Sequence, residues 1–280
     1  MPKNKIAFQG ELGAYSHIAC NEVFNNTEVK TCNTFEETFK TAYEDDSYKI
    51  IIPLENSLAG RVADIHYLLP KYKLQIHAEH FQQVEHNLLA KENVEIKDIK
   101  FVRSHVQAIG QCQNFINKNN FKTIISADTA GSAKDLAEGK EKTIGAIASK
   151  LSAEIYKLKI LKKNIEDEPG NVTRFLIMGK KVQHPEYSKE KKFITSCIFR
   201  LKSEPSALYK CLGGFATNQI NLTKLESFSV KNTFDQFNFY LDLEGHIDDK
   251  PVQKALEELG FHTVNLDILG VYEASKFRQK

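Results

Sequence analysis

The sequence predicts a mostly parallel α/β region in two lobes, followed by a smaller C-terminal α/β domain. Three observations support this fold class. Short apolar runs alternate with helical patterns as far as residue 179, a charged segment follows at 180–192, and the remaining residues give the element order βαββαβ. We therefore place the first domain at 1–182 and the second at 193–280.

The first region begins with alternating strands and helices. The apolar runs at 5–10 and 49–57 end in a glycine and in a polar turn, which predicts two buried strands. Between them, Thr34 and Glu37 have the spacing of a capping box, so a helix is expected to begin there, with Phe35, Thr38 and Phe39 facing inward. The remaining expected elements are a helix at 62–69, an alternating strand at 74–90, strands at 99–102, 123–126, 143–148 and 174–178, and helices after Ser104, at 129–137 and at 149–156.

The charged segment at 180–192 contains one proline and has no sustained apolar period, which is typical of a domain linker. The elements expected after it are strands at 193–201, 221–228, 236–243 and 263–269 and helices at 206–215 and 250–259. This order is that of a ferredoxin-like split βαβ unit.

Composition favours a protein that handles a small ligand. The chain has 280 residues, 41% of them hydrophobic, and its 38 Lys and Arg nearly balance its 36 Asp and Glu, so no global field favours nucleic acid or an acidic membrane surface. No apolar stretch approaches spanning length, which predicts a cytoplasmic protein. The five scattered cysteines suggest reduced, buried thiols, and we expect no metal site.

Four polar clusters follow predicted strand ends, where parallel α/β sheets place their sites. In the first, glycines permit a tight turn at 10–13 and Ser16 is the expected cap of a helix whose amides would face an anion, although a plain turn and cap is an equal alternative. The glycine spacing differs from a dinucleotide fingerprint. The second cluster is Glu55, Asn56 and Ser57, directly after three isoleucines; a polar turn is the alternative.

The third cluster contains Ser104, His105, Gln107 and Gln111. The two glutamines share a helical face, which suits carboxylate binding, and the absence of a G-x-S-x-G elbow argues against a nucleophilic serine. The fourth cluster follows a loop ending at Gly170 and leads into a strand; its members are Asn171, Thr173, Arg174 and Phe175. Alone, it would be an ordinary strand start.

Taken in order, G-x-x-G-x-Y-S, E-N-S-x-x-G, S-H-x-Q-A and N-x-T-R-F closely resemble the motifs of the prephenate dehydratase family. The segments at 207–210 and 220–227 are similar to the ACT-type regulatory domain of these enzymes. The resemblance implies a periplasmic-binding-protein-like catalytic region with its site in the cleft. It also implies conversion of prephenate to phenylpyruvate, with loss of CO2 and water and without a cofactor, in L-phenylalanine biosynthesis.

The resemblance also implies residue roles. The catalytic set is Thr173, Glu55, Asn56, Ser104 and Gln111. The substrate-binding set is Arg174, Phe175, Gln107, His105, Ser57, Asn171 and Ser16. An L-phenylalanine effector is expected at Ala207, Leu208, Asn221, Leu222, Glu226 and Ser227. A homodimer or homotetramer is implied as well, with no nucleic-acid or membrane partner.

Three positions depart from the family pattern. Ser206 and Phe228 stand where many members have the glycine and arginine associated with phenylalanine binding, and Val106 stands where proline is usual. Two other functions remain open at this point. The chain could be an arogenate dehydratase, or it could be a non-catalytic amino-acid sensor or solute-binding protein.

Overall fold

The computed structural model describes residues 4–61, 65–180, 184–230, 233 and 236–279. The described chain forms two compact units. Unit 1 comprises residues 4–41, 47–61 and 80–175, and unit 2 comprises 42–46, 65–79 and the described residues from 176 onward. No helix in these described ranges is long and apolar enough to cross a membrane.

The first sheet has the strand order β2-β1-β3-β11-β5, with β4 paired to β3, and β1 runs parallel to both β2 and β3. Its strands are β1 (Asn4–Gln9), β2 (Thr27–Cys32), β3 (Tyr48–Asn56), β4 (Gly60–Arg61), β5 (Gln75–Gln83) and β11 (Val172–Gly179). Helices α1 (Tyr15–Val23) and α2 (Phe35–Glu44) connect its first three strands. The centre of β3 is fully buried, as expected for an inner strand of this kind.

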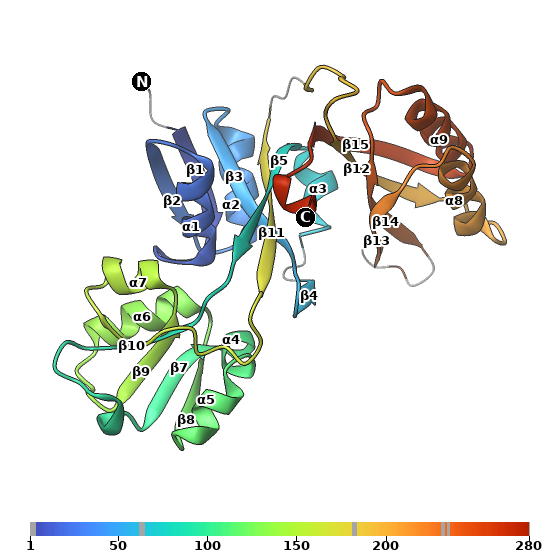
Figure 1. The fold of residues 1–280 in the computed structure, drawn as a ribbon. Helices are drawn as coiled ribbons and strands as arrows, with labels where there is room; N and C mark the ends of the chain where they lie inside the picture. The colour runs from blue at the N-terminus through green and yellow to red at the C-terminus, as the bar shows by residue number, and fades with distance from the viewer. Residues whose placement is uncertain (1–3, 62–64, 181–183, 231–232, 234–235, 280) are drawn as a thin grey trace. The chain divides into compact units, whose positions relative to one another are not determined.

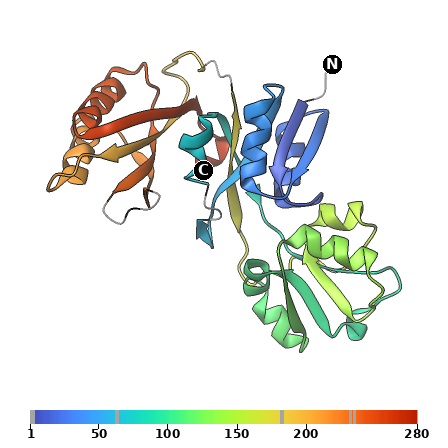
Figure 2. The ribbon, with the colours of Figure 1, turned by 180° about the vertical axis from the view of Figure 1, so that it is seen from behind.

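The second sheet lies wholly in unit 1 and has the order β10-β6-β9-β7-β8. Its strands are β6 (Asn87–Ala90), β7 (Phe101–His105), β8 (Lys122–Ser126), β9 (Ile144–Ala148) and β10 (Lys159–Lys162). The helical segments are η1 (Ile96–Asp98), α4 (Val106–Gly110), α5 (Gln113–Lys118), α6 (Thr129–Glu138) and α7 (Lys150–Ile155). The chain passes between the two sheets twice, once after β5 and once before β11 (Figure 1, and from behind in Figure 2), which confirms the two-lobed α/β prediction.

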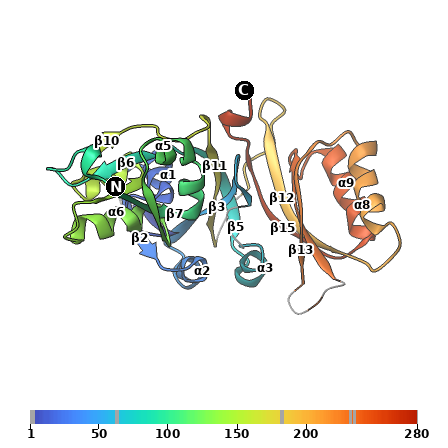
Figure 3. The same ribbon diagram turned by 90° about the horizontal axis from the view of Figure 1, so that it is seen from below.

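The C-terminal part of unit 2 has the predicted βαββαβ order and an antiparallel sheet of order β13-β14-β12-β15. Its elements are β12 (Phe193–Leu201), α8 (Ala207–Thr217), β13 (Leu222–Ser229), β14 (Phe237–Glu244), α9 (Lys250–Phe261) and β15 (Thr263–Glu273). Helices α8 and α9 lie on the same face of the sheet (Figure 3), where Phe215 and Leu259 pack against Leu241 in one core.

The other face of this sheet is in contact with an earlier segment of unit 2, which contains α3 (Leu68–Tyr72). His66 is fully buried and its ring packs against Phe228 and Tyr240. A β-carbon placed on Gly270 would lie 2.3 Å from the backbone oxygen of Ile76, so only glycine permits this approach. This segment therefore covers part of the face opposite α8 and α9.

The predicted capping box is present with one difference. The Glu37 amide donates to the Thr34 hydroxyl as expected. The Glu37 carboxylate accepts from the amide of Asn33, whereas a capping box predicts the amide of Thr34. Thr38 and Phe39 are fully buried, and Phe35 is half-buried.

Several expected elements differ from the observed ones. The helix expected at 62–69 begins at Leu68 and ends at Tyr72, with Pro70 in its first turn, where a missing amide hydrogen costs no helical bond; residues 62–64 lie outside the described residues. The single strand expected at 74–90 is two strands, β5 and β6, because the chain changes sheets between them. Strands β2 and β10 were not predicted; both are edge strands with few buried side chains.

Candidate active site

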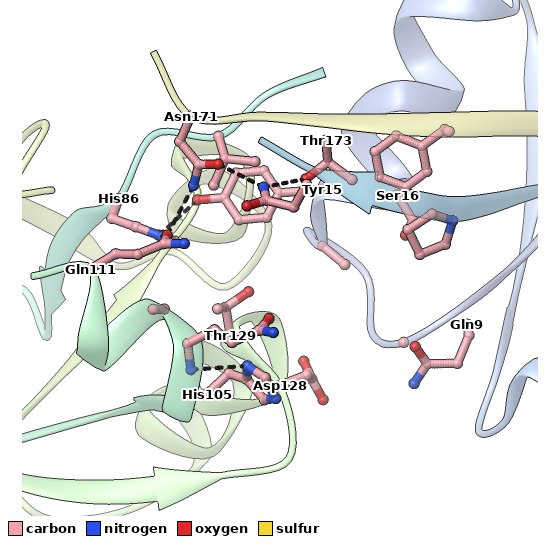
Figure 4. Close-up of a pocket in the computed structure, with 18 of the residues that line it drawn as sticks. Gln9, Tyr15, Ser16, His86, His105, Gln111, Asp128, Thr129, Asn171 and Thr173 are labelled. Carbon is pink, nitrogen blue, oxygen red and sulfur yellow. Dashed lines mark hydrogen bonds between the residues drawn. The ribbon is translucent and has the colours of Figure 1, made fainter. Parts of the chain in front are cut away.

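A cavity of about 360 Å³ lies in unit 1 and is lined by residues from both of its sheets (Figure 4). Eight of the predicted catalytic and substrate-binding residues line it, namely Ser16, Asn56, His105, Gln107, Gln111, Asn171, Thr173 and Phe175. Gln107 and Gln111 both reach the cavity, as their predicted common helical face requires. The sequence clusters are thus brought to one place although they are far apart in the chain.

Strand alternation selects which residues of the fourth cluster reach the cavity. Asn171, Thr173 and Phe175 are two residues apart, lie at the start of β11 and line the cavity. Successive side chains of a strand point to opposite faces, so Arg174 lies on the face away from the cavity. Thr173 is 7% exposed and Asn171 is 1% exposed, so their polar groups are shielded from bulk water.

Asn56 fixes the orientation of the Thr173 hydroxyl. The Asn56 Oδ1 atom accepts from the amides of Leu58 and Ala59, at 3.1 and 2.8 Å, which identifies Nδ2 as the end of the side chain that faces β11. Nδ2 donates to Oδ1 of Asn171 at 2.6 Å and to Oγ1 of Thr173 at 3.0 Å. The Thr173 oxygen is therefore an acceptor in this bond, and its own proton is available to the cavity.

The same hydrogen-bond direction continues from Asn171 to the second sheet. Asn171 Nδ2 donates to Oε1 of Gln111 at 2.9 Å, and Nε2 of His86 lies 2.9 Å from the same oxygen (Figure 4). Because a carbonyl oxygen can only accept, His86 carries its proton on Nε2. With Oε1 occupied twice, the Gln111 Nε2 group is the donor that remains for a ligand.

Two buried groups at the end of this network are held neutral. Burial lowers the pKa of His86 below its ordinary value of 6.5. Burial also raises the pKa of Tyr15, with smaller contributions from Cys112, Glu166 and Glu85. The Tyr15 hydroxyl lies 3.1 Å from His86 Nδ1 and 2.6 Å from the Glu85 carbonyl oxygen.

The first turn of α1 forms another part of the cavity wall. The prediction that Ser16 caps this helix is wrong: the helix begins earlier, at Tyr15, and its N-cap is Ala14. Alanine provides no side-chain cap, so the first amides of the helix lack a side-chain acceptor. Gly13 has φ +91°, and a β-carbon there would lie 2.8 Å from the Cα of Ser152. The hydroxyls of Ser149 and Ser152 donate to the Gly13 carbonyl at 2.6 and 3.0 Å, which fixes the turn. Ser16 follows this turn and is 9% exposed.

A model of the prephenate dehydratase family matches residues 6–183. The chain belongs to the prephenate dehydratase family. It is therefore an enzyme of the dehydratase class of lyases, associated with aromatic amino-acid biosynthesis.

Three relatives match nearly the whole chain. A bifunctional N-acyl-homoserine lactone acylase/prephenate dehydratase of Komagataeibacter europaeus is 40% identical over 276 residues, with 98% of each chain covered. The prephenate dehydratase of Methanocaldococcus jannaschii is 36% identical over 266 residues, covering 93% of this chain and 94% of the relative. Arogenate dehydratase/prephenate dehydratase 2 of Arabidopsis thaliana is 35% identical over 277 residues, covering 96% and 72%.

A solved structure supports the fold. The prephenate dehydratase of Arthrobacter aurescens, determined in complex with L-Phe, aligns with a TM-score of 0.87 at 26% identity and covers 96% of this chain and 90% of that chain. The agreement extends over the α/β region and the βαββαβ region together.

Four predicted residues of this dehydratase do not line the cavity. Arg174, 2% exposed, donates to Glu55 at 3.0 Å on the opposite side of the strands. The buried Ser104 hydroxyl donates to the Ile147 carbonyl at 2.6 Å, which joins β7 to β9. The Ser57 hydroxyl accepts from the Val172 amide at 3.0 Å. Each of these hydrogen bonds fixes a strand that contains, or lies next to, a residue that lines the cavity.

The structure adds cavity residues that were not predicted, namely Gln9, Tyr15, His86, Asp128 and Thr129 (Figure 4). Asp128 and Thr129 follow β8 and begin α6, which is the same strand-end signal that identified the other clusters. His86 carries no local signal, because it lies in the crossover between two strands that were expected to be one. Across the part of the chain that the structure describes, no group of three or more His, Cys, Asp or Glu side chains is arranged to hold a metal ion.

The residues predicted to bind phenylalanine are distributed over two parts of the C-terminal region. Ala207 and Leu208 line a second cavity, of about 690 Å³, between the start of α8 and the start of β14. Asn221, Leu222, Glu226 and Ser227 lie on or before β13, outside that cavity lining. Glu226 pairs with Lys224 at 3.1 Å and lies 3.6 Å from His66.

Proposed function

We propose that this chain aromatises prephenate to phenylpyruvate and that Thr173 donates its hydroxyl proton to the departing ring hydroxyl. In this reaction the bond from the ring to its carboxylate breaks, and its electrons enter the ring as CO2 leaves. The carbon–oxygen bond at the opposite ring position breaks in the same process, and the departing oxygen takes the Thr173 proton and leaves as water. The Thr173 oxygen regains a proton from solvent, so one proton is consumed in each turnover. Aromatisation supplies the driving force, so the reaction requires no cofactor.

The observation that carries this proposal is the bond from Asn56 Nδ2 to Thr173 Oγ1. It occupies a lone pair of Oγ1 and leaves the O–H of this buried side chain free to donate into the cavity. A hydrogen bond that strengthens as negative charge grows on the leaving oxygen lowers the barrier more than it stabilises the bound substrate.

Amide groups bind the substrate carboxylates in this proposal. Gln111 presents its Nε2 donors, Gln107 lies on the same helical face, and the first amides of α1 with the Ser16 hydroxyl form a third donor group. A carboxylate bound by neutral amides keeps less of its hydration than in water, which favours its conversion to neutral CO2.

We assign positioning roles to the four predicted residues outside the cavity. The Glu55–Arg174 pair joins β3 to β11, so it keeps Asn56 and Thr173 in register. Ser104 fixes β7, the strand that ends at His105, and Ser57 fixes the start of β11 next to Asn171.

The direct test is the turnover of prephenate by the purified protein, followed as phenylpyruvate absorbance in alkali. Thr173→Val keeps the shape of the side chain and removes the proton, so we expect kcat to fall by about 10²-fold or more, with KM changing little. Thr195→Val, a buried threonine of β12, is the matched control and should keep full kcat. Unchanged kcat in folded Thr173→Val would remove Thr173 from the mechanism, and a folded wild-type protein that binds prephenate without turnover would favour a binding protein.

We also propose that residues 193–280 form the ACT-type regulatory domain and that L-phenylalanine inhibits the enzyme through it. The support is the βαββαβ order and the likeness to the Arthrobacter aurescens dehydratase, whose structure contains L-Phe. Addition of L-phenylalanine during prephenate turnover tests this, and unchanged rates would contradict it. The cytoplasmic location and the dimer or tetramer stay predictions.

The Komagataeibacter europaeus relative is also named an acylase, but we do not extend that activity to this chain. Acyl transfer uses a nucleophile activated by an adjacent base. The histidines of the cavity, His86 and His105, are hydrogen-bonded to groups other than Ser16 in the described structure.

A further inference from the structure

The charged side chain that lines the cavity is acidic. Asp128 is the single carboxylate among the described lining residues, and none of these residues is lysine or arginine. Prephenate brings two carboxylates to this cavity. Arogenate is the same ring with an α-ammonium group in place of the keto group, so its side chain carries no net charge. A cavity with a carboxylate and no cationic side chain is better matched to the less anionic substrate.

Asp128 is held in place by the start of α6. It is the N-cap of this ten-residue helix, and its Oδ1 accepts from the amide of Gly131 at 2.6 Å. A β-carbon on Gly131 would lie 2.8 Å from Asp128 Oδ2, so a larger residue at position 131 would clash with the carboxylate. A carboxylate has about four acceptor positions, and the cap uses one, so Asp128 keeps acceptor capacity for a ligand.

The geometry of the substrate brings its side chain toward Asp128. The ring hydroxyl and the side chain are attached to opposite ring positions. Thr173 lies on β11 of the first sheet, whereas Asp128 follows β8 of the second, and the two residues are on opposite sides of the cavity (Figure 4). When the hydroxyl is bound at Thr173, the side chain extends to the wall that Asp128 forms.

We propose that Asp128 determines the substrate preference of this enzyme and makes arogenate the better substrate, by accepting a hydrogen bond from its α-ammonium group. This inference rests on the proposed dehydratase function and names the substrate class that the site favours. A charge-assisted bond forms with arogenate, whereas with prephenate the carboxylate faces a keto oxygen and cannot donate to it. Asp128 therefore attracts the ammonium group of arogenate and repels the keto oxygen of prephenate, and both effects favour arogenate.

The test is Asp128→Asn, because asparagine is as good an N-cap as aspartate and preserves the start of α6 while removing the charge. We expect the ratio of kcat/KM for arogenate over prephenate to fall by about tenfold or more, through a loss with arogenate and a gain with prephenate. Asp135→Asn is the matched control: it removes the same charge from the same helix, at a side chain that is 55% exposed and pairs with Arg103. It should leave the ratio unchanged.

A binding measurement separates this inference from the proposed function. Calorimetric titration of both substrates into Thr173→Val protein, with and without Asp128→Asn, reports the preference without turnover. Tighter binding of arogenate that is lost with Asp128→Asn supports the inference, even if the wild-type protein turns over neither substrate and the dehydratase proposal fails. An unchanged binding ratio in Asp128→Asn would overturn the inference while leaving prephenate turnover intact.

Discussion

Asn56 sets the direction of a hydrogen bond to the Thr173 hydroxyl, which is the proton donor in our proposal. Asn56→Asp keeps the size of the side chain and the oxygen that accepts from Leu58 and Ala59, but it replaces the Nδ2 donor by an acceptor. The Thr173 hydroxyl would then donate to residue 56 instead of the cavity. We predict that kcat for prephenate falls by at least about tenfold in Asn56→Asp, measured at saturating substrate.

The control for this variant is the thermal unfolding midpoint, which shows that the protein remains folded at the assay temperature. We expect the midpoint to fall, because the new carboxylate is buried and one of its oxygens faces Oδ1 of Asn171, which accepts from Nδ2 in the wild-type protein. Full activity in a folded Asn56→Asp protein would contradict the assigned direction of the hydrogen bond.

His86 makes the stability of the protein sensitive to pH. Burial lowers its pKa in the folded protein below 6.5, so the unfolded chain binds a proton that the folded chain does not. The contribution of neutral His86 is complete above pH 6.5 and is lost as pH falls below that value. The unfolding midpoint of the wild-type protein should therefore decrease more between pH 7.5 and pH 5.5 than that of His86→Gln, measured by calorimetry. Parallel decreases in both proteins would contradict this assignment.

The orientation of individual side chains explains why the candidate site could be predicted only in part. Thr173 and Arg174 are adjacent in one motif, and so are Asn56 and Glu55, yet only one member of each pair reaches the cavity. The motif identifies the segment that lies at the cavity. Which of two adjacent residues points into the cavity depends on the alternation of side chains along the strand. His86 and Asp128 come to the cavity through sheet packing and a crossover, which no local pattern encodes.

The backbone at the start of α8 is strained. Ser206 is its N-cap and has φ +62°, a left-handed conformation that favours glycine. We predict that Ser206→Gly raises the free energy of unfolding by about 1 kcal/mol, measured by urea denaturation. Ser203→Gly in the same loop is the matched control, because Ser203 does not have a positive φ and should gain nothing. A loss of stability in Ser206→Gly would contradict this interpretation.

The two strands β2 and β10, which have few buried side chains, were not predicted, whereas strands with a long buried run were. Strand β12 was predicted with its observed bounds, because residues 193–199 are all buried and most of them are apolar. Strand β2 exposes most of its side chains and gives no such pattern. Phe228 shows the limit of a motif comparison: it replaces an arginine of the family pattern, and in this chain it is 4% exposed and packs against His66 and Tyr67.

At the scale of the whole chain, the last residues are tied to an early strand within unit 2. Arg278 binds Glu79 through two nitrogens, at 2.7 and 3.0 Å, and the Glu79 side chain is fully buried. Removing the guanidinium leaves a buried carboxylate with fewer partners. Arg278→Met should therefore lower the free energy of unfolding by about 3 kcal/mol. Lys276→Met, an exposed neighbour, should have little effect, and equal losses in the two variants would contradict the proposed contribution of this pair.

We propose that Asn56 and Thr173 act as one unit in which the Asn56 amide directs the proton of the Thr173 hydroxyl. The most direct measurement is a double-mutant cycle on kcat for prephenate, with Thr173→Val, Asn56→Asp and the combined variant. If the two residues act as one unit, the combined variant should be no slower than the slower single variant, because each change removes the same proton donation. Losses that multiply in the combined variant would show two independent contributions and would contradict the claim.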